Sequence, residues 1–226
     1  MRLITESQVI DLMDMELAVE SIHRTFKELH DGKEINHPKV NLDLGQSGDY
    51  PYFDGFINAM PAYVEWVHMA GLKWVVGMGG KRKELGLPYI NSILVLADPE
   101  TGEFQGVLSG TYISNIRTGA QSAVALHELL PNQDTISVGM FGAGIQARTQ
   151  VEAISTRFQI EDLTVYNHRL STAEKFAEEM QKNVTNPIKI TTNPKEATDH
   201  EVLITVTHAQ EPFLCQWDHS KKSVMI

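Results

Sequence analysis

Most of the fold follows from one sequence, Ile136-Ser-Val-Gly-Met-Phe-Gly142-Ala-Gly144-Ile-Gln146-Ala147. The apolar run from Thr135 to Phe141 is typical of a buried strand, and the run from Gln146 to Phe158 suits a helix. Between them, Gly142, Gly144 and Ala147 have the G-x-G-x-x-A spacing of a dinucleotide-binding turn. Gly142 permits the tight turn, Gly144 lets the backbone approach a pyrophosphate, and Ala147 is small enough for the helix to pack on the strand. Since the first helical N–H groups and the helix dipole favour phosphate, the turn predicts a nicotinamide or flavin nucleotide and redox chemistry. The alternative is a chance glycine turn.

The sequence after this turn continues the pattern of a parallel sheet. A second strand, Leu163-Thr-Val-Tyr166, comes at the right distance, and a helix is expected at Ser171–Gln181. Further strands are expected at Ile188–Thr191 and Val202–Val206. Residues 126–226 are therefore predicted to form a Rossmann domain. A doubly wound sheet normally continues beyond the strand that begins near Lys221, so we expect this domain, and hence the sequence, to be incomplete at its C-terminus.

The first part of the chain mixes helices and antiparallel strands, and residues 1–125 are predicted to form an α+β domain. Thr5-Glu-Ser-Gln8 is typical of a capping box, and Asp14 is expected to cap a second helix that ends near Gly32. Strands are expected at residues 39–44, 72–76, 90–97 and 104–108, a loop at 77–83, and a long helix at 111–130. The fold class is therefore α/β: an N-terminal α+β domain, followed by a Rossmann domain.

Composition excludes several classes of protein. The formal net charge of −10 argues against a broad surface for nucleic acid or an anionic membrane. No apolar run approaches membrane-spanning length, and the first residues lack the apolar core of a secretory signal. Cys215 is the only cysteine, so no internal disulfide is possible, and the nine histidines have no metal-ligand spacing. We expect a protein of the reducing cytoplasm that holds no metal.

Three cations are candidates for binding an anionic substrate. Arg117 lies within the long predicted helix, in Ser114-Asn-Ile-Arg117-Thr-Gly-Ala-Gln-Ser, and Lys73 and Lys39 lie in predicted strands. Arginine binds a carboxylate through two parallel hydrogen bonds, and lysine adds a point charge. The alternative is that all three are ordinary solvated surface charges, as most charged residues are.

Four motifs taken together resemble the ornithine cyclodeaminase/mu-crystallin family. They are Gly71-Leu-Lys73-Trp, Leu94-Val-Leu-Ala-Asp98-Pro-Glu-Thr-Gly102, Ile116-Arg117-Thr118-Gly-Ala120 and Gly142-Ala-Gly144-Ile-Gln146-Ala147. They occur in the family's order with similar spacing, and they cover the chain from about Lys39 to its end. Such a group of motifs is far more specific than the glycine turn alone.

The resemblance implies a homodimer in which each subunit has a substrate and dimerisation domain and a nucleotide domain. It also implies a nicotinamide cofactor and an amino-acid or cyclic-imine substrate. Lys73 matches the family's substrate-carboxylate lysine, Arg117 its arginine that touches substrate and cofactor, and Lys39 a position where members often have arginine. The resemblance and the turn together give these cofactor-binding candidates: Arg117, Thr118, Gly142, Gly144, Ile145, Gln146, Asn167, His168, Arg169 and Thr207.

Two departures from the family pattern bear on the reaction. Asn58, two positions before Met60, stands where ornithine cyclodeaminases have an acidic residue, which argues against strict ornithine cyclisation. The family's catalytic aspartate follows the strand that begins near Ser223, beyond the last residue of this sequence, so no general acid or base is assigned here.

The sequence Tyr166-Asn167-His168-Arg169 ends the second strand and bears on cofactor choice. A carboxylate there would bind the ribose 2′-hydroxyl of NAD, whereas arginine can pair with the 2′-phosphate of NADP. We therefore expect NADP, with NAD as the alternative if Arg169 is merely solvated. The predicted function is an NAD(P)-dependent amino-acid dehydrogenase or imine reductase. The alternatives are an ornithine cyclodeaminase, which makes proline and ammonia, and a non-catalytic, crystallin-like protein that binds NADPH and a ligand.

Overall fold

The computed structural model describes residues 1–45, 50–207, 209, 211–214 and 224–226. It divides the chain into two compact units. The N-terminal unit comprises residues 1–14 and 23–114, and the C-terminal unit comprises residues 15–22 and 115–226. Cys215 and the start of the predicted last strand, residues 221–223, lie outside the described residues.

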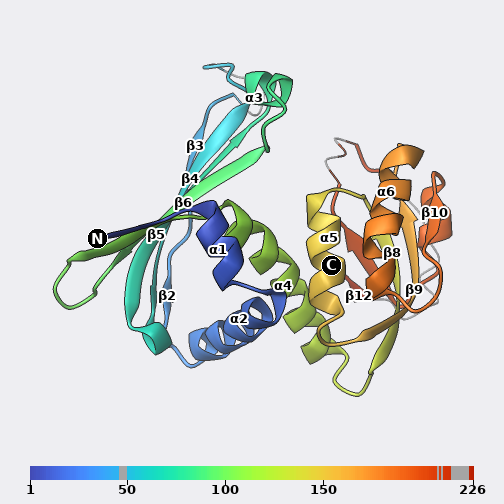
Figure 1. The fold of residues 1–226 in the computed structure, drawn as a ribbon, viewed down its shortest axis with the longest axis horizontal. Coiled ribbons are helices and arrows are strands. Elements are labelled where there is room, and N and C mark those ends of the chain that lie inside the picture. The colour runs from blue at the N-terminus through green and yellow to red at the C-terminus, as the bar shows by residue number, and fades with distance from the viewer. Residues whose placement is uncertain (46–49, 208, 210, 215–223) are drawn as a thin grey trace. The chain divides into compact units, whose positions relative to one another are not determined.

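The N-terminal unit is built on a seven-stranded, mostly antiparallel sheet (Figure 1). Its neighbouring strands pair in an antiparallel sense except β1 and β7, which are parallel. The order along the sheet is β1 (Arg2–Ile4), β7 (Phe104–Ser109), β6 (Ile90–Ala97), β5 (Met69–Met78), β4 (Gly55–Val64) and β2 (Ile35–Asn36), while β3 (Val40–Asp43) also pairs with β4.

The ten-residue strand β4 is not among the strands expected from sequence. Its sequence contains Pro61, which lacks a backbone N–H and normally argues against a central strand. Pro61 is tolerated because it lies between the β4 residues that pair with β2 and those that pair with β3. Neighbouring strands therefore override the local signal.

Three helices and a short 3-10 turn, η1 (Glu65–Val67), join these strands; the helices are α1 (Glu6–Leu12), α2 (Met15–His30) and α3 (Gly80–Glu84). The capping box is confirmed, since the Thr5 N–H donates to Gln8 Oε1 at 2.9 Å and the Thr5 side chain accepts from the Gln8 N–H. The loop expected at residues 77–83 is wrong in part, because it contains α3. The Gly80 N–H donates to the Asp54 side chain at 3.0 Å, a contact between residues distant in sequence that local patterns do not encode.

The C-terminal unit contains a five-stranded sheet in which every pair is parallel. Its order is β10 (Lys189–Thr191), β9 (Gln159–Tyr166), β8 (Thr135–Phe141), β11 (Val202–Thr205) and β12 (Val224–Met225). Counted from β8, this order is 3-2-1-4-5, that of a Rossmann sheet. Helices α5 (Ile145–Ile154) and α6 (Leu170–Met180) lie across one face (Figure 1), and the connections include η2 (Gln181–Asn183) and η3 (Pro194–Ala197). The predicted α/β class is confirmed.

Helix α4 (Thr111–Leu129) packs against α5 through small residues in the C-terminal unit. A Cβ added to Gly119 would lie 2.1 Å from the Thr149 carbonyl oxygen, so only glycine allows this approach. Ala153 at the same contact is fully buried, as is Ala120, the next residue of α4. The close packing brings the α4 segment that carries Arg117 alongside the first turn of α5.

Among the residues that the structure describes, no helix has the length and apolarity needed to cross a membrane. Within the same residues, no group of three or more metal-ligating side chains lies close enough to hold an ion.

Candidate functional site

A cavity of about 450 Å³ lies at the carboxyl ends of β8, β9 and β11 in the C-terminal unit. Ligands of open parallel sheets bind at this edge. The cavity brings together six of the sequence-predicted cofactor residues: Gly142, Gly144, Asn167, His168, Arg169 and Thr207. They come from three segments that are separated by more than twenty residues along the chain.

The glycine turn has the backbone geometry that its two glycines were expected to supply. Gly142 has φ of +111°, and its N–H donates to the Tyr166 carbonyl at 2.8 Å. A Cβ at Gly142 would lie 2.8 Å from the Val206 carbonyl oxygen. Gly144 is the N-cap of α5, and no atom lies within 4 Å of the position its Cβ would take. The wall of the cavity is therefore bare backbone followed by a helix N-terminus, a chemistry suited to phosphate.

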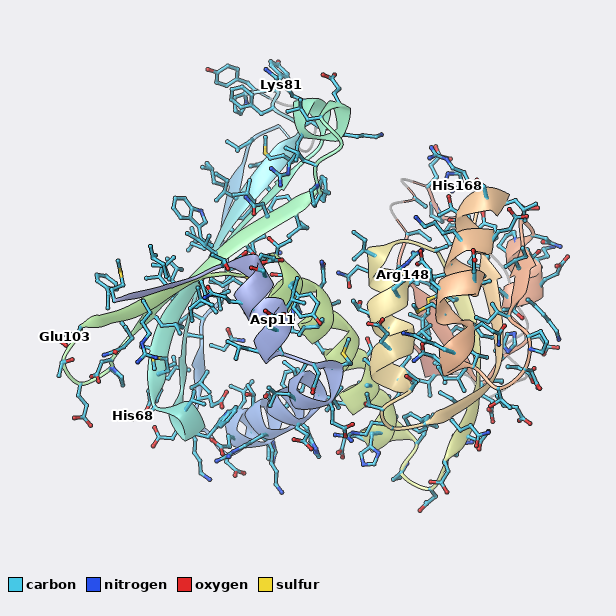
Figure 2. All side chains as sticks on the ribbon, in the orientation of Figure 1. Asp11, His68, Lys81, Glu103, Arg148 and His168 are labelled. Atoms are coloured by element: carbon cyan, nitrogen blue, oxygen red, sulfur yellow. The ribbon has the colours of Figure 1, made fainter. Side chains whose placement is uncertain are left out.

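The end of β9 forms a second wall of the cavity. Asn167 is buried, and its Nδ2 donates to the Arg169 carbonyl at 2.9 Å. This bond fixes the turn that presents His168 and Arg169, both of which are exposed (Figure 2 labels His168). No carboxylate lines the cavity among the described residues, whereas Arg169 contributes a positive charge, and this combination suits an anionic ligand.

Sequence reasoning missed the aromatic residues of this cavity. The Tyr166 and Phe213 rings are stacked, with centroids 5.4 Å apart and an interplanar angle of 29°, and both line the cavity. Tyr166 was signalled by its place at the end of a strand. Phe213 lies in a segment with no periodic pattern and was not foreseeable.

The remaining predicted cofactor residues lie where α4 and α5 pack together. Gln146 Nε2 donates to Asn115 Oδ1 at 3.0 Å, which ties the start of α5 to α4. Thr118 lies on the same stretch of α4, and Ile145 is exposed at the first position of α5. The structure thus places Thr118, Ile145 and Gln146 in one part of the C-terminal unit.

Arg117 has an exposed side chain, and its Nη1 donates to Gln121 Oε1 at 3.2 Å. The surrounding protein nevertheless desolvates the guanidinium and lowers its pKa from the ordinary value. Arginine stays charged in proteins even so, because its pKa starts far above neutrality. A partly desolvated cation binds an anion more strongly than a fully hydrated one.

Lys73 belongs to the N-terminal unit, on β5. In an antiparallel sheet, directly paired residues share a face, so Lys73 shares one with Met60 of β4 and Leu94 of β6. All three line an apolar groove of about 400 Å³. A charge at an apolar surface is poised to bind a molecule with one acidic end and an aliphatic body. Lys39 immediately precedes β3 and is exposed.

The opposite face of the same sheet is apolar and open. Val40, Leu42, Trp74 and Ile93 share this face, and their exposed fractions range from 38% to 68%. We call these four residues the open face. Exposed apolar patches of this kind are typical of interaction surfaces.

Known proteins resemble the chain over nearly all of its length. The sequence model of the ornithine cyclodeaminase/mu-crystallin family matches residues 2–217. An alanine dehydrogenase from Archaeoglobus fulgidus is 31% identical over 217 residues, covering 95% of this chain and 63% of that protein.

Solved structures are also similar to this chain over nearly all of its length. The Thermococcus litoralis Δ1-pyrroline-2-carboxylate reductase, solved with NADH and L-proline, aligns with a TM-score of 0.83 and 35% identity, covering 94% of this chain and 64% of that one. An archaeal alanine dehydrogenase dimer with bound NAD aligns with a TM-score of 0.82 and 30% identity, covering 94% and 62%. The chain thus spans less than two thirds of the length of these relatives.

Proposed function

The chain belongs to the ornithine cyclodeaminase/mu-crystallin family, and from this premise we propose that the whole protein is an NAD(P)-dependent oxidoreductase. The reaction is hydride transfer at the α-carbon of an amino acid or a cyclic imine. The observation that carries the proposal is the cavity at the carboxyl edge of the parallel sheet, which is lined by Gly142 and by Gly144, the N-cap of α5. Two relatives similar over most of this chain, an alanine dehydrogenase and a pyrroline-2-carboxylate reductase, act on substrates of this kind.

The nucleotide is proposed to bind through the C-terminal unit, with its diphosphate at the glycine turn and its ribose near the end of β9. Residues 126–226 form the nucleotide domain in this proposal, and residues 1–125 form the substrate and dimerisation domain. When bound, the nicotinamide supplies or accepts the hydride. In this proposal Gly142 and Gly144, which line the cavity, and Ile145 at the start of α5 offer backbone to the diphosphate, while the cavity residues Asn167, His168 and Thr207 take the adenosine half.

NADP is the proposed cofactor, because Arg169 is exposed at the cavity and no described carboxylate there repels a 2′-phosphate. Solved relatives hold NADH and NAD, so NAD is the competing outcome. The ratio of the dissociation constants for NADPH and NADH, compared between wild type and Arg169→Ser, separates the two. A ratio unchanged by the substitution would overturn the NADP assignment.

The substrate carboxylate is proposed to bind to Lys73 and Arg117, with Lys39 as a third cation. Two cations of different chemistry suit one carboxylate, since the guanidinium makes a bidentate contact and the ammonium adds charge. Holding the carboxylate fixes the α-carbon in space, which supplies the orientation that hydride transfer needs. The apolar groove beside Lys73 favours an aliphatic side chain or ring.

Asn58 distinguishes this proposal from ornithine cyclisation. It is 6% exposed on β4, on the same sheet face as Met60 and Lys73. A neutral amide at this position cannot take up the proton that a carboxylate would. The proposal therefore favours a dehydrogenase or imine reductase over a cyclodeaminase.

We also propose that the protein is a homodimer joined through the open face. Burying Val40, Leu42, Trp74 and Ile93 against a second copy would remove a large apolar surface from water, and burial of that kind drives stable association. An aromatic residue near the centre of such a patch is the residue type that dominates interface energies.

The test is to incubate the whole protein, including sequence beyond residue 226, with NADPH or NADH and a panel of 2-oxo acids with ammonia and of cyclic imines, following the absorbance of reduced nicotinamide. Proline and ammonia formation from ornithine is measured separately, because cyclisation returns the hydride. Turnover of an oxo acid or imine is the expected result. Nucleotide binding without turnover of any substrate would instead indicate a crystallin-like binding protein, and absence of nucleotide binding would overturn the whole proposal.

A further inference from the structure

The side chain of Arg148 on α5 is hydrogen-bonded to the backbone of the glycine turn that precedes this helix (Figure 2 labels Arg148). Its Nη1 donates to the Ala143 carbonyl at 2.8 Å and to the Gly144 carbonyl at 3.1 Å. One guanidinium nitrogen therefore fixes two consecutive peptide groups. Neither the predicted nor the proposed function uses this residue.

Fixing those two carbonyls also fixes the two N–H groups on the other side of the same peptides. In a planar trans peptide the C=O and the N–H point in opposite directions. The carbonyl of Ala143 shares a peptide with the Gly144 N–H, and the carbonyl of Gly144 shares one with the Ile145 N–H. With both carbonyls directed to Arg148, both N–H groups point away from it. These are N–H groups at the start of a helix, where no intrahelical acceptor exists and an anion is favoured.

The hydrogen bonds from Arg148 matter because the residue between the two peptides, Gly144, has no Cβ to limit its backbone conformation. A peptide that flanks a residue without Cβ can rotate through conformations closed to other residues. The Gly144 carbonyl also accepts from the Arg148 backbone N–H at 3.4 Å, so loss of the guanidinium would release mainly the peptide between Ala143 and Gly144. That peptide would then have to be ordered when a ligand binds, and the ordering weakens binding. Arg148 removes this cost in advance.

Arg148 is itself held from two sides by α6. Its Nε pairs with the Glu179 carboxylate, and its guanidinium lies 5.5 Å from the centroid of the Phe176 ring. Hydrogen bonding from Arg148 lowers the pKa of the Glu179 carboxyl, so the pair stays ionised. The side chain is 23% exposed, and its described hydrogen bonds, ion pair and ring contact go to α6 and the turn. The guanidinium thus has a fixed position from which to orient the peptides.

We propose that Arg148 is a positioning residue for the diphosphate of a bound dinucleotide: it orients the Gly144 and Ile145 N–H groups toward the ligand, and Glu179 and Phe176 hold it in place. This inference rests on the proposed function. The alternative is a structural strap between α5 and α6 that supports the whole nucleotide cavity and has no specific effect on the diphosphate.

The experiment measures dissociation constants of three ligands, NADPH, ADP-ribose and adenosine, for wild type and Arg148→Met. Methionine keeps much of the side-chain volume and removes the donors. We expect affinity for NADPH and ADP-ribose, which contain the diphosphate, to fall about tenfold or more, while affinity for adenosine changes less than about twofold. A structural strap would instead weaken all three ligands alike.

Arg157→Met is the matched control. Arg157 is also 23% exposed and also forms an ion pair, with Glu16 at 3.4 Å, but it contacts no residue of the turn among those described. It should leave all three affinities unchanged. Glu179→Gln is the second variant, which retains the donors of Arg148 and loosens their anchor; an intermediate, diphosphate-specific loss is expected.

Equal loss for all three ligands, or wild-type affinity for ADP-ribose in both Arg148→Met and Glu179→Gln, would overturn the inference. If Arg148→Met does not fold, Glu179→Gln alone decides it by the same ligand comparison. Failure of the wild-type protein to bind either NADPH or ADP-ribose would instead overturn the proposed function, and the role of Arg148 would fall with it.

Discussion

Replacing Gly144 by alanine should abolish tight dinucleotide binding while leaving the fold intact. Gly144 has φ of −85° and ψ of −166°, extended backbone that any residue adopts, and no atom lies within 4 Å of the added Cβ. Alanine is a poorer N-cap than glycine by about 0.5–1 kcal/mol. Against that, it stiffens the unfolded chain, which stabilises the protein by about 0.4–1 kcal/mol. The two effects offset each other, so the free energy of unfolding should barely change.

Although the Gly144→Ala substitution should barely affect folding, it should weaken binding of the dinucleotide. The space beside Gly144 lies at the cavity wall, where the diphosphate is proposed to approach the backbone. A methyl group there would displace the diphosphate from the helix N-terminus. We expect affinity for NADPH to fall by about 10–100-fold, or ~1.4–2.8 kcal/mol.

Gly142→Ala provides the contrast, because its cost falls on the fold itself. Its φ of +111° strains any residue with a Cβ, by about 1–3 kcal/mol. The added Cβ would also lie 2.8 Å from the Val206 carbonyl oxygen, and such overpacking adds about 1–3 kcal/mol. At about 2–4 °C per kcal/mol for a chain of this size, the melting temperature should fall by several degrees or more.

The assay is scanning calorimetry of both variants and wild type with and without NADPH, together with fluorescence titration of NADPH. For Gly144→Ala we expect a wild-type melting temperature without ligand, and a smaller rise than in wild type at the same NADPH concentration. For Gly142→Ala we expect a lowered melting temperature in the absence of any ligand. Wild-type NADPH affinity in Gly144→Ala would refute the placement of the diphosphate at this turn.

Three further predictions concern other parts of the chain. Arg117→Ala should lower kcat/KM by about 2–5 kcal/mol of transition-state stabilisation, measured by steady-state kinetics, and wild-type kinetics would remove Arg117 from the substrate site. Trp74→Asp on the open face should convert the proposed dimer to a monomer in sedimentation experiments, because burying a carboxylate among apolar side chains is unfavourable, and an unchanged sedimentation coefficient would contradict that interface. Burial lowers the pKa of His200 below its ordinary value of 6.5. The unfolded chain therefore takes up the proton first as the pH falls below that value. Stability should then decline by at most ~1.4 kcal/mol per pH unit from this group, and His200→Gln should reduce the decline in pH-dependent urea titrations.

Local sequence patterns predicted much of the Rossmann unit because each of its elements carries its own signal. The apolar run before Gly142, the spacing of the two glycines and the small Ala147 are properties of a dozen consecutive residues. Strand β4 shows the limit of such reasoning. Pro61 weakens its local signal, and the strand forms because β5 pairs along its whole length.

The residues of the candidate site also fall into two groups: those that local sequence predicted and those that only the structure revealed. Gly142, Gly144, Asn167 and Arg169, which line one cavity, were predicted from sequence because their proposed roles depend on the conformation of the turns that contain them. Phe213 and Arg148 were not, because a phenylalanine in an irregular segment and an arginine on a helix look like ordinary residues. Phe213 is distinguished only by its stacking on Tyr166, and Arg148 only by its contacts with Glu179 and Phe176.

The amino-acid order alone was therefore enough to establish the family, the parallel sheet and the position of the glycine turn, since steric and periodic constraints act over a few neighbouring residues. Folding in three dimensions was needed to show that one guanidinium is hydrogen-bonded to that turn and that one face of the antiparallel sheet is left open. Both depend on contacts between segments far apart in the chain, whose pairing is set by packing and not by local conformational preference.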